Sequence, residues 1–198
     1  MCLLSTLIGV EFDISLGSTY NFSTDITIDS QIPDGQNFKF SSKPSTYGFK
    51  SPQYYSLRFR FQKKELELIH HKLYFEDSLP GEVSHFEITD GYNMLMINIL
   101  SPINRDKSPD IFSFRFGLGT VIAHPDVTVN GNRFYQTGGG LIPTVWTDGY
   151  QISGLCSQFG FNITKISYAR ASIDLGKQYK LNVPNLAIHF LMGISFGK

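Results

Sequence analysis

The sequence predicts an all-β protein, an eight-stranded antiparallel up-and-down transmembrane β-barrel that forms a single domain over residues 1–198. Three observations support this prediction. Long segments alternate between large apolar residues and small or polar residues, which is the period of a strand with two unlike faces. No helical pattern of any length separates these segments. The chain also ends in such a segment, and barrel closure is the simplest way to leave no unpaired strand edge.

The segment 183–198 shows the alternation most clearly. Its apolar row consists of Leu186, Ile188, Phe190, Met192, Ile194 and Phe196. The other row is small or polar except for Leu191. We expect this last strand to pair with the first strand and to turn its apolar row toward lipid.

The first predicted strand runs from Ile8 to Ile28, with the even-numbered apolar residues on one face throughout. Strands of soluble domains average about 5–6 residues, whereas a membrane-crossing strand needs about 9–11. The length therefore favours a membrane barrel. Residues 1–7 lack a basic start and a cleavage site, and they are interpreted as a signal remnant or a lead-in to the strand.

Six further strands are predicted at 53–62, 65–75, 84–100, 111–123, 149–161 and 166–175. In the segment 84–100 we expect Phe86, Ile88, Tyr92, Met94 and Met96 to face outward, and His85, Glu87, Thr89, Gly91 and Asn93 to face inward. The pattern blurs at residues 70–72, which predicts a bulge or the membrane boundary.

The predicted connections alternate in length along the chain. Short turns are expected at 62–65, 101–109 and 161–165, and longer loops at 30–51, 76–83, 124–148 and 176–183. In an up-and-down barrel alternate connections lie at the same end, so this pattern gives one rim of turns and one of loops. That layout is typical of bacterial outer-membrane barrels.

The inner rows carry charges of both signs. The predicted polar network of the lumen consists of Glu11, Asp13, Arg58, Arg60, Glu67, Glu87, Arg115 and His189. Unpaired buried charge is costly, so these groups must pair inside a barrel that side chains can fill. We therefore expect a largely plugged lumen.

The bulk composition excludes some functions. The chain has 17 basic and 17 acidic residues, which gives no support to a nucleic-acid partner. Its two cysteines, Cys2 and Cys156, lack the spacing of metal ligands, and we predict no metal and no cofactor. A soluble, lipocalin-like barrel would show the same alternation with the apolar row inside. The glycine-rich polar rows and nearly uninterrupted apolar rows favour the membrane form.

Three segments resemble small eight-stranded bacterial outer-membrane β-barrel proteins: ELELIHHKLYFED (65–77), HFEITDGYNML (85–95) and VPNLAIHFLMGISF (183–196). Within that group the chain is similar to the lipid A deacylases of the PagL-like type and to acyloxyacyl-hydrolase-type barrels. The resemblance implies a location in the bacterial outer membrane and contact with its lipid and lipopolysaccharide. It also implies insertion by the barrel-insertion machinery, because Leu191–Phe196 resembles the export signal of such barrels.

The deacylase resemblance implies a His-x-Ser-Asn motif, and the nearest match here begins at His85. Glu87 occupies the serine position, so the nucleophile is missing and the remaining catalytic candidates are His85, Glu87 and Glu67. A histidine and carboxylate cluster across two strands is expected to be a polar network rather than a metal site.

Three functions remain open from the sequence. The first is a non-enzymatic barrel with a structural role, or one that binds a partner or ligand through loops 30–51 and 124–148. The second is a lipid A-modifying hydrolase that uses His85. The third is a narrow channel for small or hydrophobic solutes.

Overall fold

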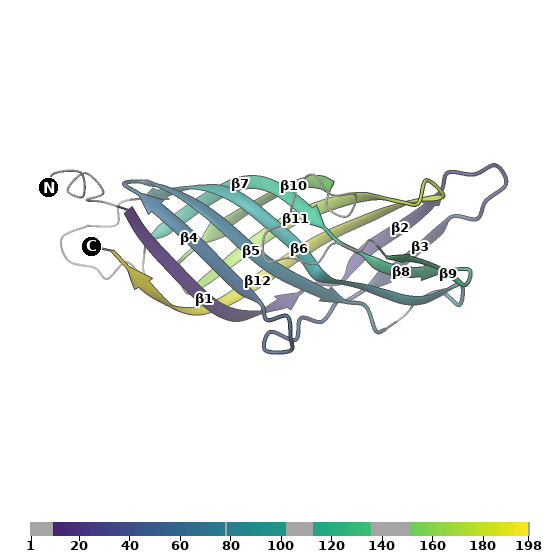
Figure 1. Cartoon of the computed structure of the whole chain (residues 1–198), viewed down its shortest axis with the longest axis horizontal. Helices are drawn as coiled ribbons and strands as arrows, with labels where there is room; N and C mark the ends of the chain where they lie inside the picture. The colour runs from purple at the N-terminus through teal and green to yellow at the C-terminus, as the bar shows by residue number, and fades with distance from the viewer. Residues whose placement is uncertain (1–9, 78, 102–112, 136–150, 198) are drawn as a thin grey trace, which may run out of the picture.

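The structure, a computed structural model, describes residues 10–77, 79–101, 113–135 and 151–197 (Figure 1). Among these residues no helix has the length and apolar character needed to cross a bilayer. The strands are β1 (Val10–Asn21), β2 (Thr24–Ser30), β3 (Phe38–Ser42), β4 (Tyr55–Phe61), β5 (Lys64–Tyr74), β6 (Val83–Ser101), β7 (Phe114–Ala123), β8 (Asp126–Val129), β9 (Asn132–Tyr135), β10 (Gln151–Gly160), β11 (Thr164–Leu175) and β12 (Tyr179–Phe196).

Eight of these strands close into a barrel. Their order is β1-β4-β5-β6-β7-β10-β11-β12, all neighbours are antiparallel, and β12 pairs back onto β1. The closing seam runs from the pair Phe12–Phe196 to the pair Asn21–Ala187. The predicted fold class, an eight-stranded antiparallel up-and-down barrel, is confirmed, as is the pairing of the last strand with the first.

Two hairpins extend the barrel at the end opposite the chain termini (Figure 1). Strand β2 continues β1 along the long strand β12, and β8 continues β7 along the long strand β6. Strands β3 and β9 complete these hairpins. We call this end of the molecule the extension and define it as β2, β3, β8, β9 and the strand segments paired with β2 and β8.

Three segments predicted to be long loops have a different structure. Segment 30–51 contains β3, and segment 124–148 contains β8 and β9, while residues 136–148 lie outside the described part of the chain. The loop predicted at 176–183 is a tight turn, because β11 and β12 pair as far as Leu175 and Tyr179. Gly176 and Lys177, at φ 56° and 60°, adopt the left-handed conformation that this turn requires. The predicted turn at 101–109 lies mostly outside the described residues.

A register shift separates β1 from β2. Between the pairs Asn21–Ala187 and Thr27–Asn182, residues 22–26 face residues 183–186, so five residues lie opposite four. One extra residue turns every following side chain to the other face. Ile14 and Leu16 are therefore exposed on the outside, whereas Ile26 and Ile28 are fully buried. The prediction of one continuous apolar row from Ile8 to Ile28 was wrong beyond Phe22, which is still exposed.

The predicted facing of β6 was also wrong. Met94 and Met96 are fully buried, and the row of Leu95, Ile97 and Ile99 is the exposed one. Directly paired residues share a face of the sheet, and Met96 is paired with the buried Glu67 of β5. The bulge predicted near residues 70–72 is confirmed, because the register between β5 and β6 shifts between His71 and Leu73.

The barrel interior has two parts. In the extension and the adjoining half of the barrel it is an apolar core. Its members include Ile26, Ile28, Leu73, Phe75, Phe86, Ile88, Val127, Leu175 and Leu181. In the half that holds the chain termini the interior side chains are mainly charged or polar.

The barrel exterior carries a broad surface of large apolar side chains, which we call the outer apolar band. It includes Ile14, Leu16, Phe59, Phe61, Leu66, Leu95, Ile97, Ile99, Phe116, Leu118, Leu155, Phe159, Phe190, Met192, Ile194 and Phe196, all exposed. The barrel half beside the termini thus has charged groups inside and apolar groups outside, as the alternation of each strand dictates.

Candidate functional site: a charged network in the lumen

Eight ionisable side chains meet inside the barrel, and we call them the lumen network. They are Glu11 and Asp13 of β1, Arg58 and Arg60 of β4, Glu65 and Glu67 of β5, Arg115 of β7 and Lys165 of β11. Each occupies the inner row of its strand, so the closure of the sheet alone brings them together. Four carboxylates face four cations, and the formal charges balance.

Glu67 is the centre of the network. It is fully buried, and Oε1 accepts hydrogen bonds from Ser56 Oγ at 2.6 Å and Arg58 Nε at 2.7 Å. Oε2 accepts from Gln158 Nε2 at 2.5 Å and Asn98 Nδ2 at 2.9 Å. Lys165 Nζ also donates to Oε1. This coordination offsets the cost of removing a carboxylate from water.

A second group of ion pairs lies toward the rim that carries the termini. Arg60 contacts Glu11 at 2.7 Å, Glu65 at 3.2 Å and Asp13 at 3.3 Å. Arg115 lies 3.6 Å from Glu65. These contacts link β1, β4, β5 and β7 across the lumen through oppositely charged groups.

The turn between β10 and β11 closes the network from one side. The side-chain oxygen of Asn162 accepts hydrogen bonds from Arg58 and, at 3.0 Å, from Arg115 Nη1. Arg58 also donates to the Asn162 carbonyl at 3.2 Å. The turn is therefore tied to both arginines.

A layer of hydrogen-bonded histidines separates the network from the apolar core. His189 Nδ1 lies 2.6 Å from the Tyr54 hydroxyl, and Nε2 lies 2.6 Å from Ser167 Oγ. His71 Nε2 lies 3.1 Å from Thr19 Oγ1 and 3.2 Å from Thr46 Oγ1. A serine beside a histidine has the geometry of an activated nucleophile, but Ser167 and His189 are almost fully buried between the charged and the apolar layers.

Most of the predicted network residues lie together. Glu11, Asp13, Arg58, Arg60, Glu67 and Arg115 belong to the lumen network, and His189 lies in the adjoining histidine layer. Glu87 does not belong to the lumen network, and the prediction that placed it in the lumen was wrong. It lies in the extension, where Thr89 Oγ1 donates to its carboxylate at 3.1 Å. The mistake follows from the facing of β6 and the bulge beside it.

The catalytic candidates do not form one site. His85 Nε2 lies 3.9 Å from Glu87 and 3.6 Å from Asp126 in the extension, whereas Glu67 lies in the lumen network. Thr89, not a serine, supplies the hydroxyl near Glu87. The three predicted catalytic candidates, His85, Glu87 and Glu67, therefore do not place a nucleophile in contact with a base.

The cluster of His85, Glu87 and Asp126 has donor atoms within 4.8 Å of one another, a spacing that a metal ion could bridge. Arg133 donates to both carboxylate oxygens of Asp126, from Nε at 2.9 Å and Nη2 at 2.5 Å. These hydrogen bonds hold the pKa of Asp126 below its ordinary value. Because the guanidinium already provides the positive charge, we assign the cluster as an ion-pair cluster.

Sequence reasoning missed several members of the network. Glu65 was placed on the correct face but not in the network, and Lys165, Asn98 and Gln158 were not assigned. Lys165 begins an inner row that continues through Ser167, Ala169 and Ala171. That run of small residues was the signal that could have identified it.

These features define the class of the molecule, a closed eight-stranded barrel with an apolar exterior and an interior that is charged in one half and apolar in the other. No family model and no curated protein matches the chain. It is similar in fold to the attachment invasion locus protein Ail of Yersinia pestis, at 14% identity and a TM-score of 0.35, over 93% of this chain and 99% of that one.

Two further solved structures are similar to the chain. Ail of Yersinia pestis in complex with the heparin analogue sucrose octasulfate matches at 12% identity and a TM-score of 0.34, over 93% of this chain and 100% of that one. Neisserial surface protein A matches at 9% identity and a TM-score of 0.34, over 91% and 94%. At these values the likenesses support no statement about function.

Proposed function

We propose that this protein is a closed β-barrel of the bacterial outer membrane that holds the extension at the cell surface as a platform for binding a partner or ligand. The observation that carries the proposal is that the barrel has the opposite polarity to a soluble protein. Paired charged side chains lie in its lumen, and the outer apolar band covers its exterior. A surface of this size and character is stable in lipid and is an aggregation hazard in water.

The proposal assigns the bilayer to the outer apolar band. Lipid and lipopolysaccharide are then the surroundings of the barrel, and the barrel-insertion machinery delivers it. The end with the termini and the short turns faces the periplasm, as in bacterial barrels of this layout. The extension then faces outward.

The extension suits a binding role because it is built from paired strands over an apolar core rather than from long irregular loops. It also exposes Tyr135 and Arg133 at its surface. Aromatic residues and arginine are the types that dominate binding energy at protein interfaces. A rigid surface loses little conformational entropy on binding.

The lumen network argues against a channel. Four carboxylates and four cations pair across the barrel, and Glu67 has hydrogen-bond partners on both oxygens. An ion that entered would have to break pairs that are costly to break.

Two measurements test this proposal. Conductance tests whether the lumen is closed, and cell fractionation tests the location in the outer membrane. The purified protein in planar bilayers should give no steady current under conditions where a general porin conducts, and the protein should be recovered with outer-membrane fractions. A steady current would favour the channel, and a protein that remains monodisperse without detergent would contradict the membrane location.

A further inference from the structure

The segment between β3 and β4 contains a short loop, residues 47–53, which we call the wall loop. It projects from the outside of the barrel wall beside the start of β4 (Figure 1). Phe49 lies on this loop and is 75% exposed. The loop packs closely on β1, because a Cβ atom added at Gly48 would lie 2.2 Å from the carbonyl oxygen of Gly17. The large exposed ring of Phe49 is therefore held close to the outer face of the barrel.

Three backbone oxygens of the wall loop have hydrogen-bond partners within the protein. Lys72 of β5 is fully buried, and its Nζ donates to the carbonyl oxygens of Tyr47 at 3.0 Å and Lys50 at 2.5 Å. The Lys50 N–H donates to the Tyr47 carbonyl at 3.0 Å. The Tyr54 N–H donates to the Gly48 carbonyl at 2.8 Å. A loop at the edge of the hydrocarbon region needs such partners, because acyl chains offer no hydrogen bonds.

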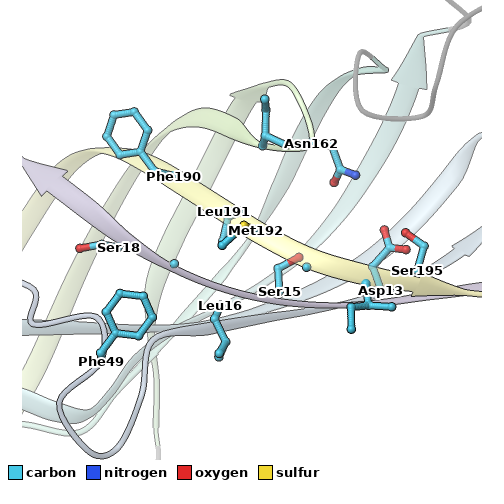
Figure 2. A pocket seen from close by; sticks show the side chains of 14 residues that line it. Asp13, Ser15, Leu16, Ser18, Phe49, Asn162, Phe190, Leu191, Met192 and Ser195 are labelled. Carbon is cyan, nitrogen blue, oxygen red and sulfur yellow. The ribbon is translucent and has the colours of Figure 1, made fainter.

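Phe49 lies next to the outer apolar band. It lines a cavity at the barrel surface together with Leu16 and Phe190, two residues of the band (Figure 2). Ser18 also lines this cavity, and its hydroxyl donates to the Thr46 carbonyl at 3.3 Å. The Phe49 ring thus extends the apolar band beyond the strands of the barrel wall.

Lys50, the next residue, lies against aromatic rings on the side of the extension. Its Nζ is 4.5 Å from the centre of the Tyr74 ring and 5.4 Å from that of the Tyr47 ring. Tyr74 is paired with Glu87 in the extension, and the Tyr47 hydroxyl donates to Glu76 at 2.6 Å. The wall loop therefore has an apolar side toward the band and a polar side toward the extension.

The depth of the wall loop in a bilayer follows from the outer row of β1. This row is apolar at Leu16, and the last exposed side chain of the strand is Tyr20. Lys43 Nζ lies 4.1 Å from the centre of the Tyr20 ring. Aromatic residues and lysine are typical of the head-group level at a membrane surface. Because Phe49 lies beside Leu16, its ring is on the hydrocarbon side of that level.

We propose that the wall loop is a lipid anchor, with the Phe49 ring among the acyl chains of the outward-facing leaflet and the Lys50 ammonium group at the head groups. The exposed polar residues Ser51 and Gln53 follow Lys50 and lie at the head-group level with the loop backbone. One apolar and one polar side are the features of an interfacial segment. The inference rests on the proposed membrane location and adds a lipid contact outside the barrel strands.

Tryptophan quenching tests the anchor in vesicles of phosphatidylcholine with brominated acyl chains that hold the whole chain. Every variant carries Trp146→Phe, which removes the one tryptophan of the sequence. Phe49→Trp keeps an aromatic ring at an exposed position, so it should fold as the unaltered protein does. It should lose as much fluorescence as Ile97→Trp, a variant in the outer apolar band. The matched control is Tyr135→Trp, exposed in the extension, which should keep its fluorescence.

The outcomes separate the anchor from the membrane location. Quenching of Ile97→Trp without quenching of Phe49→Trp would overturn the anchor and leave the membrane location intact. Equal quenching of Phe49→Trp and Tyr135→Trp would also overturn the anchor, because the wall loop would then be no closer to lipid than the extension. The absence of quenching at all three positions would contradict the membrane location, together with the anchor that rests on it.

Discussion

Glu67 is the residue on which the polar half of the barrel depends most. It is fully buried between Arg58 and Lys165, and both cations are buried with it. The substitution Glu67→Gln keeps the shape and removes the charge, which leaves two buried cations short of a partner. We expect it to destabilise the barrel by about 3–5 kcal/mol, measured from denaturant unfolding in phospholipid vesicles.

The control for this change is Asp25→Asn at the surface. Asp25 lies 3.8 Å from Lys39, and both side chains are largely exposed, so little stability should be lost. The double variant Glu67→Gln, Lys165→Met restores the balance of charge. It should cost less than the sum of the two single changes, and strict additivity would contradict the coupling assigned to this pair.

At the scale of the element, the β8–β9 hairpin is held by the ion pair of Asp126 with Arg133. The hydrogen bonds from Arg133 are the main cause of the lowered pKa of Asp126, with His85 adding to it. A carboxylate with a lowered pKa stabilises the folded state above its ordinary value of 3.8, and that stability is lost as the pH falls through the folded pKa.

Asp126→Asn should therefore raise amide hydrogen exchange in β8 and β9 at pH 7 by roughly two- to fivefold, the range expected of an ion pair whose arginine is exposed to water. The difference from the unaltered protein, corrected for intrinsic exchange, should shrink to nothing as Asp126 becomes protonated. Exchange in the β2–β3 hairpin should stay unchanged. A difference that persists at low pH would indicate that the side-chain shape, and not the charge, holds the hairpin.

The alternation of residue types predicted correctly which row of a strand faces the lumen where the two rows differ in chemistry. In β4 the row of Arg58 and Arg60 can only face inward, and Phe59 and Phe61 can only face outward. In β6 both rows are apolar in the middle of the strand, so Met94 and Leu95 are equally plausible lipid-facing residues from the sequence alone. The pairing of Met96 with the buried Glu67 decides the facing, and pairing across strands cannot be seen in one strand's own sequence.

The register shift after Asn21 escaped prediction for a related reason. The residues on both sides of it keep the same alternation, and only the count against β12, five residues opposite four, turns Ile26 and Ile28 inward. Asp13 and Arg115 could be assigned to the lumen network from the sequence, because they lie on strands whose polar and apolar rows alternate plainly. Lys165 was missed because the facing of its strand was left uncertain, although the small residues Ser167, Ala169 and Ala171 mark the inner row that it begins.

For the whole molecule, barrel closure makes the facing of the outer side chains and the pairing of the inner charges depend on each other. Each barrel strand exposes one row to its surroundings and the other to the lumen, so the lumen network can be paired only if the outer apolar band faces outward. The identity of the surrounding solvent therefore decides whether a charge placed on the band is costly.

The variant Ile97→Lys tests this coupling at an exposed position in the middle of the part of β6 that pairs with β7. In a bilayer a lipid-facing lysine costs about 2–4 kcal/mol near the midplane, whereas on a surface that faces water the change should stay within about 0.5 kcal/mol. We expect the larger loss, measured as the shift in the unfolding midpoint in phospholipid vesicles followed by the mobility of unboiled protein. The matched control is Ile32→Lys beyond β2, an exposed isoleucine outside the band, which should leave the midpoint nearly unchanged. Equal effects at the two positions would show that the band does not face lipid, and the charged interior would then need another explanation.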